Sequence, residues 1–348
     1  ELEARAAVGY EETVEELLNP SEDTHGMDLD LAERYFIEWN HHVRCVPEYI
    51  AFRMVNSKSQ LEEKMILFWH GILCHTDSKN QSQIASHAEW EMLRRCGLDS
   101  FKDLLIEISK DPAMVYFLDN CLSHKDAINE NYGRELLELF SLGVGMDGEF
   151  NYTEDDVKEC ARAFTGWTLA NGIPPQPYGR YTSTFVYNPE DHDDGEKTFL
   201  GHTGNFNGVD IIDILCKQPA TARFISRHIY DFFVADEAQV PTWMETPPRD
   251  PETIKMLEDE YFRSDYNIRS MLRVLFNSDA FKNARFARIK GPIETVIGTL
   301  RLAGDWTTPK PGFETIFEEM KHMGQEILNP PSVEGWHTGR DWIDGGTL

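Results

Sequence analysis

The sequence predicts a mainly α-helical, multi-helix globular protein that carries a small β-hairpin insertion at about residues 180–202. In most segments the apolar residues recur three and four positions apart, which is the spacing of one helix face. Alternation of the kind found in strands is confined to a segment near 181–187. With 348 residues, 41% of them hydrophobic, the chain can bury a large core, and we expect one helical domain over residues 1–348.

The expected helices begin at recognisable signals. Ser59 and Glu62 have the spacing of a capping box. Pro112 and Pro251 open helical segments, and Pro219 stands in a first turn, where its missing N–H costs nothing. In chain order we expect helices at about 11–18, 29–46, 47–55, 59–75, 81–96, 100–110, 112–118, 131–142, the segment after Thr153, 208–216, 220–235, 251–262, 268–277, 292–303 and 313–327.

The β insertion follows a segment at 171–180 that is rich in Pro and Gly and therefore unsuited to a helix. Residues 181–187 alternate in the manner of a strand, and 198–200 read as a second short strand. Because only turn residues separate them, we expect the two strands to pair with each other as a hairpin.

The turn at 191–196 within this insertion packs four carboxylates and one imidazole into six residues. Such density is costly unless a cation, a lysine such as Lys197, or water relieves the repulsion. A solvated turn and a divalent-cation site both remain open, with His192 and Asp193 as candidate metal ligands. We expect the turn to be exposed, with His192 facing the same cleft as the helix at 131–142.

The formal net charge of −27 excludes several classes of partner. A nucleic-acid groove needs a basic footprint, and an anionic membrane repels an acidic surface. No apolar run approaches the roughly 18 residues of a membrane span. The cysteines form no CxxC pair, so we expect free thiols buried in helices and no metal ligation by cysteine. They are Cys45, Cys74, Cys96, Cys121, Cys160 and Cys216.

The segment 129–167 carries ionisable residues where a helix that only packs does not need them. Glu135 and Glu138 lie beside an apolar face, with Arg134 next to them and Glu130 one turn earlier. Acidic groups three apart at the edge of an apolar stripe can converge on a metal or on a proton-transfer site. They can equally form a buried ion-pair network, and the sequence leaves both interpretations open.

Two histidines flank Cys74 in the segment FWHGILCH. His70 and His75 are five apart, whereas the two histidines of a zincin motif are four apart with a glutamate between them. His70 is therefore either a core histidine bonded to a carboxylate or a general base or ligand. The chain end GWHTGRDW could approach a pocket, although a capping tail is the simpler interpretation.

A family resemblance extends over nearly the whole chain. It is carried, in order, by the segments FWHGILCH, DPAMVYFLDN, NENYGRELLELFSLGVG, YTEDDVKECARAFTGW, HDDGEKTFLG, ATARFISRHIYDFFV, KGPIETVIGTLRLAG and GQEILNPPSVEGWHTGRDWI. They resemble the DUF1800 family, a bacterial family without an established activity, so no catalytic residue is implied. Members typically start before Glu1 and continue beyond Leu348, and the resemblance therefore implies a fragment of a longer chain. No signal peptide is visible, and a periplasmic or secreted location is an expectation only.

Two classes of function follow from these residues. The first is a metal-assisted or acid–base enzyme in which Glu130, Arg134 and Glu135 meet His70 between helices, with Glu138 as a further metal ligand. Carboxylates favour calcium, magnesium or manganese, and histidine shifts the preference toward manganese, iron or zinc. The second is a non-catalytic helical module that binds a partner protein or an extracellular polymer. The sequence does not define the cofactor, the substrate or the oligomeric state.

Overall fold

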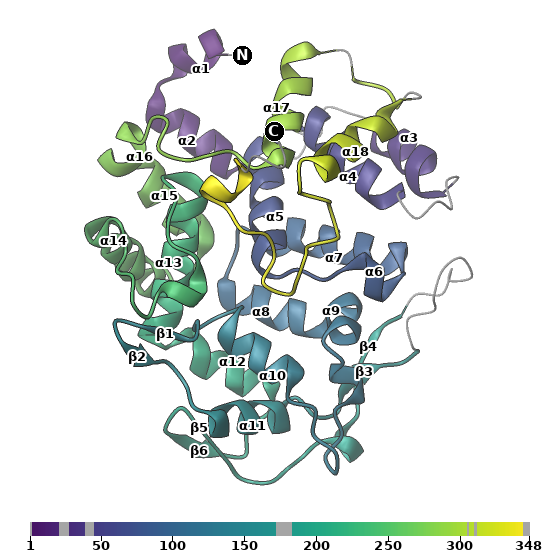
Figure 1. The fold of residues 1–348 in the computed structure, drawn as a ribbon, viewed down its shortest axis with the longest axis vertical. Coiled ribbons are helices and arrows are strands. Elements are labelled where there is room, and N and C mark those ends of the chain that lie inside the picture. The colour runs from purple at the N-terminus through teal and green to yellow at the C-terminus, as the bar shows by residue number, and fades with distance from the viewer. Residues whose placement is uncertain are drawn as a thin grey trace.

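The computed structural model describes residues 2–20, 28–38, 45–171, 183–304, 306–309 and 312–343, and helices dominate them (Figure 1). The α-helices are α1 (Leu2–Val8), α2 (Tyr10–Leu18), α3 (Leu29–Glu33), α4 (Cys45–Asn56), α5 (Gln60–Ile72), α6 (Asp77–Asn80), α7 (Gln83–Cys96), α8 (Phe101–Lys110), α9 (Pro112–Phe117), α10 (Asn131–Glu138), α11 (Glu154–Ala163), α12 (Gly208–Cys216), α13 (Pro219–Phe233), α14 (Pro251–Arg263), α15 (Ile268–Asn277), α16 (Asp279–Asn283), α17 (Pro292–Ala303) and α18 (Phe313–His322). The predicted mainly α fold is confirmed.

Several predicted helices are shorter than expected, among them α5, which ends at Ile72, and α10, which ends at Glu138. The stretch predicted as one helix at 29–46 contains α3 and then a π-helical turn, η1 (Arg34–Glu38); residues 39–44 lie outside the described ranges. The helix α4 begins at Cys45, two residues before Pro47, because proline is tolerated in a first turn. The last long helix, α18, ends at His322, and Gly324 follows with a φ of 96°, a conformation that suits glycine.

The strands form three two-stranded antiparallel sheets in the described residues, and their pairing differs from the prediction. They are β1 (Gly145–Met146) with β2 (Glu149–Phe150), β3 (Trp167–Leu169) with β4 (Phe185–Tyr187), and β5 (Lys197–Phe199) with β6 (His202–Gly204). The two predicted strands therefore do not pair with each other. β4 pairs with β3 and β5 pairs with β6, which the short alternating pattern did not predict. Leu200 and Gly201, both at positive φ, make the tight turn from β5 to β6.

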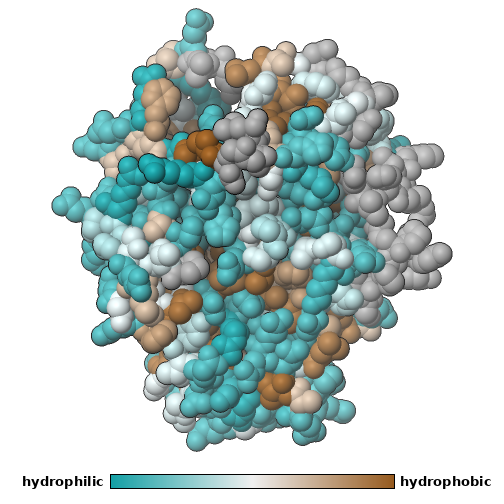
Figure 2. Space-filling model, viewed as in Figure 1, coloured by the Kyte–Doolittle hydropathy of each residue, from teal (hydrophilic) through white to brown (hydrophobic). Residues whose placement is uncertain are grey.

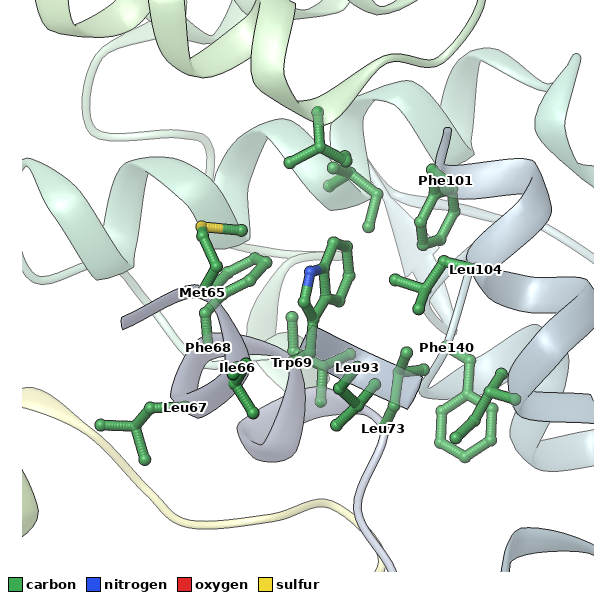
Figure 3. Packing of buried hydrophobic residues seen from close by; sticks show 14 of the residues in the cluster. Met65, Ile66, Leu67, Phe68, Trp69, Leu73, Leu93, Phe101, Leu104 and Phe140 are labelled. Carbon is green, nitrogen blue, oxygen red and sulfur yellow. The ribbon is translucent and has the colours of Figure 1, made fainter. Parts of the chain in front are cut away.

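The buried apolar residues form one large cluster in which α5 is central. Figure 3 shows Trp69 of α5 lying among side chains from α5, α7 and α8. Its ring stacks on Phe101 at a centroid distance of 5.7 Å, and its indole N–H donates to the Gly97 carbonyl oxygen at 2.7 Å. A Cβ on Gly97 would lie 2.8 Å from the Trp69 ring, so this close approach requires glycine.

Residues 328–343, which we call the C-terminal segment, cross in front of α5 and turn back toward α15 (Figure 1). The backbone N–H of Leu328 donates to Nε2 of His70 at 3.1 Å, which fixes the start of the segment on α5. Farther along, Gly335 at a φ of 80° approaches α5 so closely that a Cβ there would meet the Gly71 oxygen at 2.3 Å. The segment is therefore held against α5 by contacts that leave no room for side chains.

The surface is mostly polar, with hydrophobic residues gathered near the centre of the face in Figure 2. Within the described residues, no helix combines the length and the apolar character that crossing a membrane requires. The six cysteines are free thiols, as predicted, and four of them are buried.

Candidate functional site

A cavity of about 130 Å³ lies between α5, α13 and the C-terminal segment. Its wall continues over the residues that precede and open α17 and reaches Leu139, just after α10. The apolar part of the wall includes Phe68 of α5, Phe232 of α13, and Trp336 and Trp342 of the C-terminal segment. A mostly apolar concave site with a few polar groups directed into it is the usual form of a small-molecule site.

Three wall residues come from one face of α13. His228, Asp231 and Phe232 are three and four positions apart, so they project on the same side of the helix. The adjoining face of α13 is anchored by core residues such as Ile225 and Ile229, both fully buried. The helix therefore cannot rotate without exposing them, which fixes where the polar side chains point.

Asp231 is half-buried, and its carboxyl accepts hydrogen bonds from two donors. Its Oδ1 accepts from the backbone N–H of Glu237 at 2.7 Å, and its Oδ2 accepts from the Thr338 hydroxyl at 3.2 Å. Burial raises the pKa of Asp231 to about 6, although these donors and the nearby Arg288 act in the opposite direction. The carboxyl can therefore hold or release a proton near neutral or mildly acid pH.

His228 is a neutral base in the same wall. Burial lowers its pKa to about 3, and the neighbouring Arg227 lowers it further. The ring packs against Phe224 and Trp243 at centroid distances of 4.4 and 5.0 Å. Its Nε2 is buried and has no hydrogen-bond partner among the described residues. Because such an atom is costly to leave unsatisfied, Nε2 is a natural contact for a bound ligand.

Glu294 provides a second carboxyl, whose pKa is lowered and not raised. Burial alone would raise its pKa, but Lys64 at 3.0 Å and Arg288 at 2.6 Å outweigh this and lower the pKa to about 2. Its place is fixed by the start of α17, where it also accepts from the backbone N–H of Gly291 at 3.3 Å. The wall thus holds one carboxyl with a raised pKa, that of Asp231, and one with a lowered pKa, that of Glu294.

A fully buried ion pair supports the loop that closes on Asp231. Arg227 and Glu237 approach to 2.9 Å with side chains only 1% and 2% exposed, and the guanidinium lies 4.4 Å from the ring centre of Trp243. Glu237 also accepts from the backbone N–H of Arg249 at 3.1 Å. Because the backbone N–H of Glu237 also donates to Asp231, the ion pair of Arg227 and Glu237 holds the Asp231 carboxyl in place.

Among the described residues, none of the hydrogen bonds or ion pairs made by the residues predicted on α10 involves His70. Arg134 pairs with Glu154 of α11 at 2.7 Å and with Glu130 at 3.5 Å, and all three side chains are at least one third exposed. Glu138 accepts from the Tyr152 hydroxyl at 3.0 Å. The principal partner of α10 is therefore α11, where a Cβ on Gly133 would lie 3.0 Å from the Ala161 backbone nitrogen.

Glu135 and His70 each have a neighbour in the cavity wall. Burial, then Glu138 and Glu334, raises the pKa of Glu135 to about 7, and Glu334 belongs to the cavity wall. Glu135 does not itself line that wall. His70 lies behind the wall, fully buried, with its ring 5.3 Å from that of Trp336 and a pKa lowered to about 3 by burial. Both neighbours, Glu334 of Glu135 and Trp336 of His70, belong to the C-terminal segment.

His192 and Asp193, the metal ligands predicted on the turn at 191–196, bond to other residues of the chain. His192 is buried, with Nδ1 2.9 Å from the Thr165 carbonyl oxygen and its ring 5.6 Å from that of Tyr187. Asp193 pairs with Arg162 at 2.7 Å, and Lys197 donates to backbone oxygens of the turn. Arg162, the partner of Asp193, lies near the last residue of α11, whereas Glu138 contacts Tyr152 just before its first residue. A ten-residue helix is about 15 Å long. Glu138, His192 and Asp193 therefore do not bind one metal ion together.

Within the described ranges no three or more His, Cys, Asp or Glu side chains are arranged to hold a metal ion. The histidine that does bond to a carboxylate in the core is His75. Its Nδ1 lies 2.8 Å from Glu89 and its Nε2 lies 3.0 Å from Ser86. Asp111 sits beside Glu89, and burial, together with that neighbouring carboxylate, raises its pKa well above the usual value. This network ties α7 to the chain after α5.

Sequence reasoning missed His228, Asp231, Arg288 and Glu294. The segment RHIYDFF does place a histidine and an aspartate three apart on a helix, which was the available signal. The segment alone does not reveal which residues complete the cavity wall, because the irregular end GWHTGRDW comes from about one hundred residues farther along the chain. That end does approach a pocket, and Trp336, His337 and Thr338 all line it.

Comparisons with known proteins give a family and no named relative. The family model described as "Protein of unknown function (DUF1800)" matches residues 1–348. No curated protein matches the chain, and no solved structure does.

Proposed function

We propose that this chain, which belongs to the DUF1800 family, is an acid–base enzyme whose catalytic centre is the cavity beneath the C-terminal segment. The observation that carries the proposal is the pair of carboxyls in one wall, Asp231 with its pKa raised to about 6 and Glu294 with its pKa lowered to about 2. Environments that drive two carboxyls apart in this way assign one the role of acid and the other the role of base.

The reaction that suits this pair is hydrolysis of a carbon–oxygen bond. Asp231 gives its proton to the leaving oxygen as the bond breaks and the bonding electrons stay on that oxygen. Water adds to the carbon and gives up a proton to the carboxylate of Glu294, which releases that proton to solvent after the bond has broken. Arg288 contacts Glu294 and keeps it ionised, while solvent protons restore Asp231 for the next turnover.

Other nucleophiles are not offered by the cavity wall. Among the described residues that line it, none is a serine, cysteine or lysine, and the one hydroxyl, that of Thr338, is bonded to Asp231 and to Gln239. His228 stays neutral and has Nε2 free to bond a substrate oxygen. Carboxyl chemistry therefore explains the polar residues of this wall better than acyl transfer through a side chain does.

The test is turnover of a panel of 4-nitrophenyl carboxylic esters and glycosides by the wild-type protein and by Asp231→Asn and Glu294→Gln. Each variant is expected to lose about 10²–10⁴-fold in kcat/KM, as is usual for a general acid or base. The surface variant Asp259→Asn serves as the control, because that side chain is 67% exposed on α14.

The pH dependence gives a second readout. The wild-type kcat/KM should fall as the pH rises through about 6, where Asp231 loses its proton. Turnover that survives Asp231→Asn overturns the assignment of this residue. A correctly folded protein that turns over no member of the panel favours the alternative of a non-catalytic binding module.

A further inference from the structure

We propose that the cavity binds a saccharide, with a sugar hydroxyl in the place that the Thr338 side chain occupies, and that the bond cleaved is glycosidic. This inference rests on the proposed acid–base function and names its substrate class. It is carried by three observations that concern the hydrogen bonds of Thr338, the aromatic residues of the wall, and the distribution of charge.

The hydroxyl of Thr338 is held by two side chains in a geometry that a sugar hydroxyl can copy. It donates to Oδ2 of Asp231 at 3.2 Å and accepts from Nε2 of Gln239 at 2.8 Å. A hydroxyl has one donor and two acceptor positions, so a carboxyl oxygen and an amide N–H are complementary to it. When Asp231 is protonated, the same contact reverses, and its O–H donates to the oxygen in that place. The hydroxyl in that place is the one that the leaving sugar carries after cleavage. Before cleavage the same oxygen is the glycosidic oxygen, which accepts from the O–H of protonated Asp231 and takes its proton as the bond breaks.

Thr338 reaches this position from an irregular segment and not from a helix. It precedes the short 3-10 turn η5 (Gly339–Trp342), and the adjacent His337 side chain is 65% exposed. A segment of this kind can shift at lower cost than a packed helix, because fewer contacts have to break together. The hydroxyl of a ligand can therefore replace that of Thr338 without disturbing α13.

The aromatic part of the wall suits the flat faces of a sugar ring. Trp336 and Trp342 line the cavity from the C-terminal segment, and Phe232 lines it from α13. A pyranose presents hydroxyls at its edge and C–H groups on its faces, so it needs polar contacts around the rim and apolar rings above or below. The buried Nε2 of His228 supplies a further polar contact in the same wall.

Charge restricts the class of saccharide. The wall holds the carboxylates of Glu294 and Glu334. Lys64 and Arg288 both pair with Glu294, so the described residues of the wall offer no unpaired cation that would attract an acidic sugar. The chain as a whole carries a net charge of −27. Uronic acids and sugar phosphates would be repelled by this field, whereas neutral sugars and amino sugars would not. A neutral or amino oligosaccharide is therefore the expected ligand.

Binding and turnover are measured separately, so that the two proposals can fail separately. Full-length Asp231→Asn is titrated with glucose, N-acetylglucosamine, glucosamine and glucuronate oligomers, and tryptophan fluorescence and calorimetry report binding. We expect a neutral or amino oligomer to bind and the glucuronate oligomer not to bind. Trp342→Ala should weaken binding at least about tenfold, as loss of one aromatic contact often does. Phe150→Ala, 75% exposed on β2, is the matched control and should not change it.

The variant Thr338→Val tests the place of the hydroxyl, because valine keeps the shape and removes the competing group. Its affinity for the oligomer should increase several-fold. Weaker binding by Thr338→Val refutes the substitution of a sugar hydroxyl for this side chain. Absence of binding by every oligomer, with other panel members still turned over, refutes the saccharide inference alone. Binding by the wild-type protein without turnover refutes the catalytic proposal and leaves the saccharide site standing.

Discussion

The replacement Asp231→Asn should make the protein more stable at pH 8 and change its stability little at pH 4. In the folded chain the pKa of this carboxyl rises from 3.8 to about 6, mainly through burial. Each pKa unit corresponds to about 1.36 kcal/mol, so ionised Asp231 costs the folded state about 3 kcal/mol. Asparagine cannot ionise, yet its amide oxygen can accept from Glu237 N–H and its NH₂ group can donate to Thr338.

The sign follows from proton linkage. A raised pKa means that the folded chain binds the proton more tightly than the unfolded chain, so stability is full below pH 3.8 and falls as the pH rises through about 6. Only the wild-type protein carries this loss. Urea unfolding of both proteins at pH 4 and pH 8 should therefore show an advantage for Asp231→Asn that grows by about 3 kcal/mol between the two conditions.

Asp259→Asn again serves as the control, because this side chain is 67% exposed and pairs with Lys255 on the surface of α14. Its effect should stay within about 1 kcal/mol at both pH values. If Asp231→Asn destabilises the protein equally at pH 4 and pH 8, the carboxyl is not held in the protonated form, and its role as catalytic acid loses its physical basis.

Three further predictions concern the residues around the cavity. Glu237→Gln leaves a buried guanidinium unpaired and should cost about 3–5 kcal/mol in urea unfolding, against about 1 kcal/mol or less for the 90% exposed Asp155→Asn. Gly335→Ala should lower the melting temperature more than Gly148→Ala does, because both have positive φ but only the first would meet a backbone oxygen, at 2.3 Å. Equal losses would disprove the close contact. The ¹⁵N shifts of His70 should stay those of a neutral ring from pH 8 to pH 4, because burial lowers its pKa to about 3; its stabilising contribution, full above pH 6.5, declines as the pH falls toward 3. Titration near pH 6 would contradict its burial.

Most of the helical fold was predictable because its signals are local. Pro251 and Pro292 start helices where the sequence placed them, and the helix at 208–216 has the predicted bounds. Strand pairing was not predictable, because β4 pairs with β3, which precedes it by some fifteen residues, and those three-residue strands are too short for alternation to specify a partner. Register in such short pieces depends on the surrounding packing.

The candidate site was predictable in its chemistry and not in its location. The expected combination of carboxyls and a histidine between helices does occur, at Asp231, Glu294 and His228 in place of Glu135 and His70. Charge density along the sequence drew attention to α10 and to the acidic turn, yet most of those groups are partly exposed and paired with nearby cations. Burial decides which ionisable groups are perturbed, and burial here depends on a segment distant in sequence.

Several buried polar groups beside the cavity lower the stability of this fold. Arg227 and Glu237 are almost fully enclosed, and apolar residues of similar volume would usually serve stability as well or better. Asp231 adds a carboxyl whose ionisation is unfavourable, and His228 leaves a ring nitrogen without a partner. All of these groups lie on α13 or on the loop after it, beside one cavity. Asp111 and Glu89 carry a similar cost elsewhere in the core, but a group of such residues beside a cavity is what a preorganised binding or catalytic site requires.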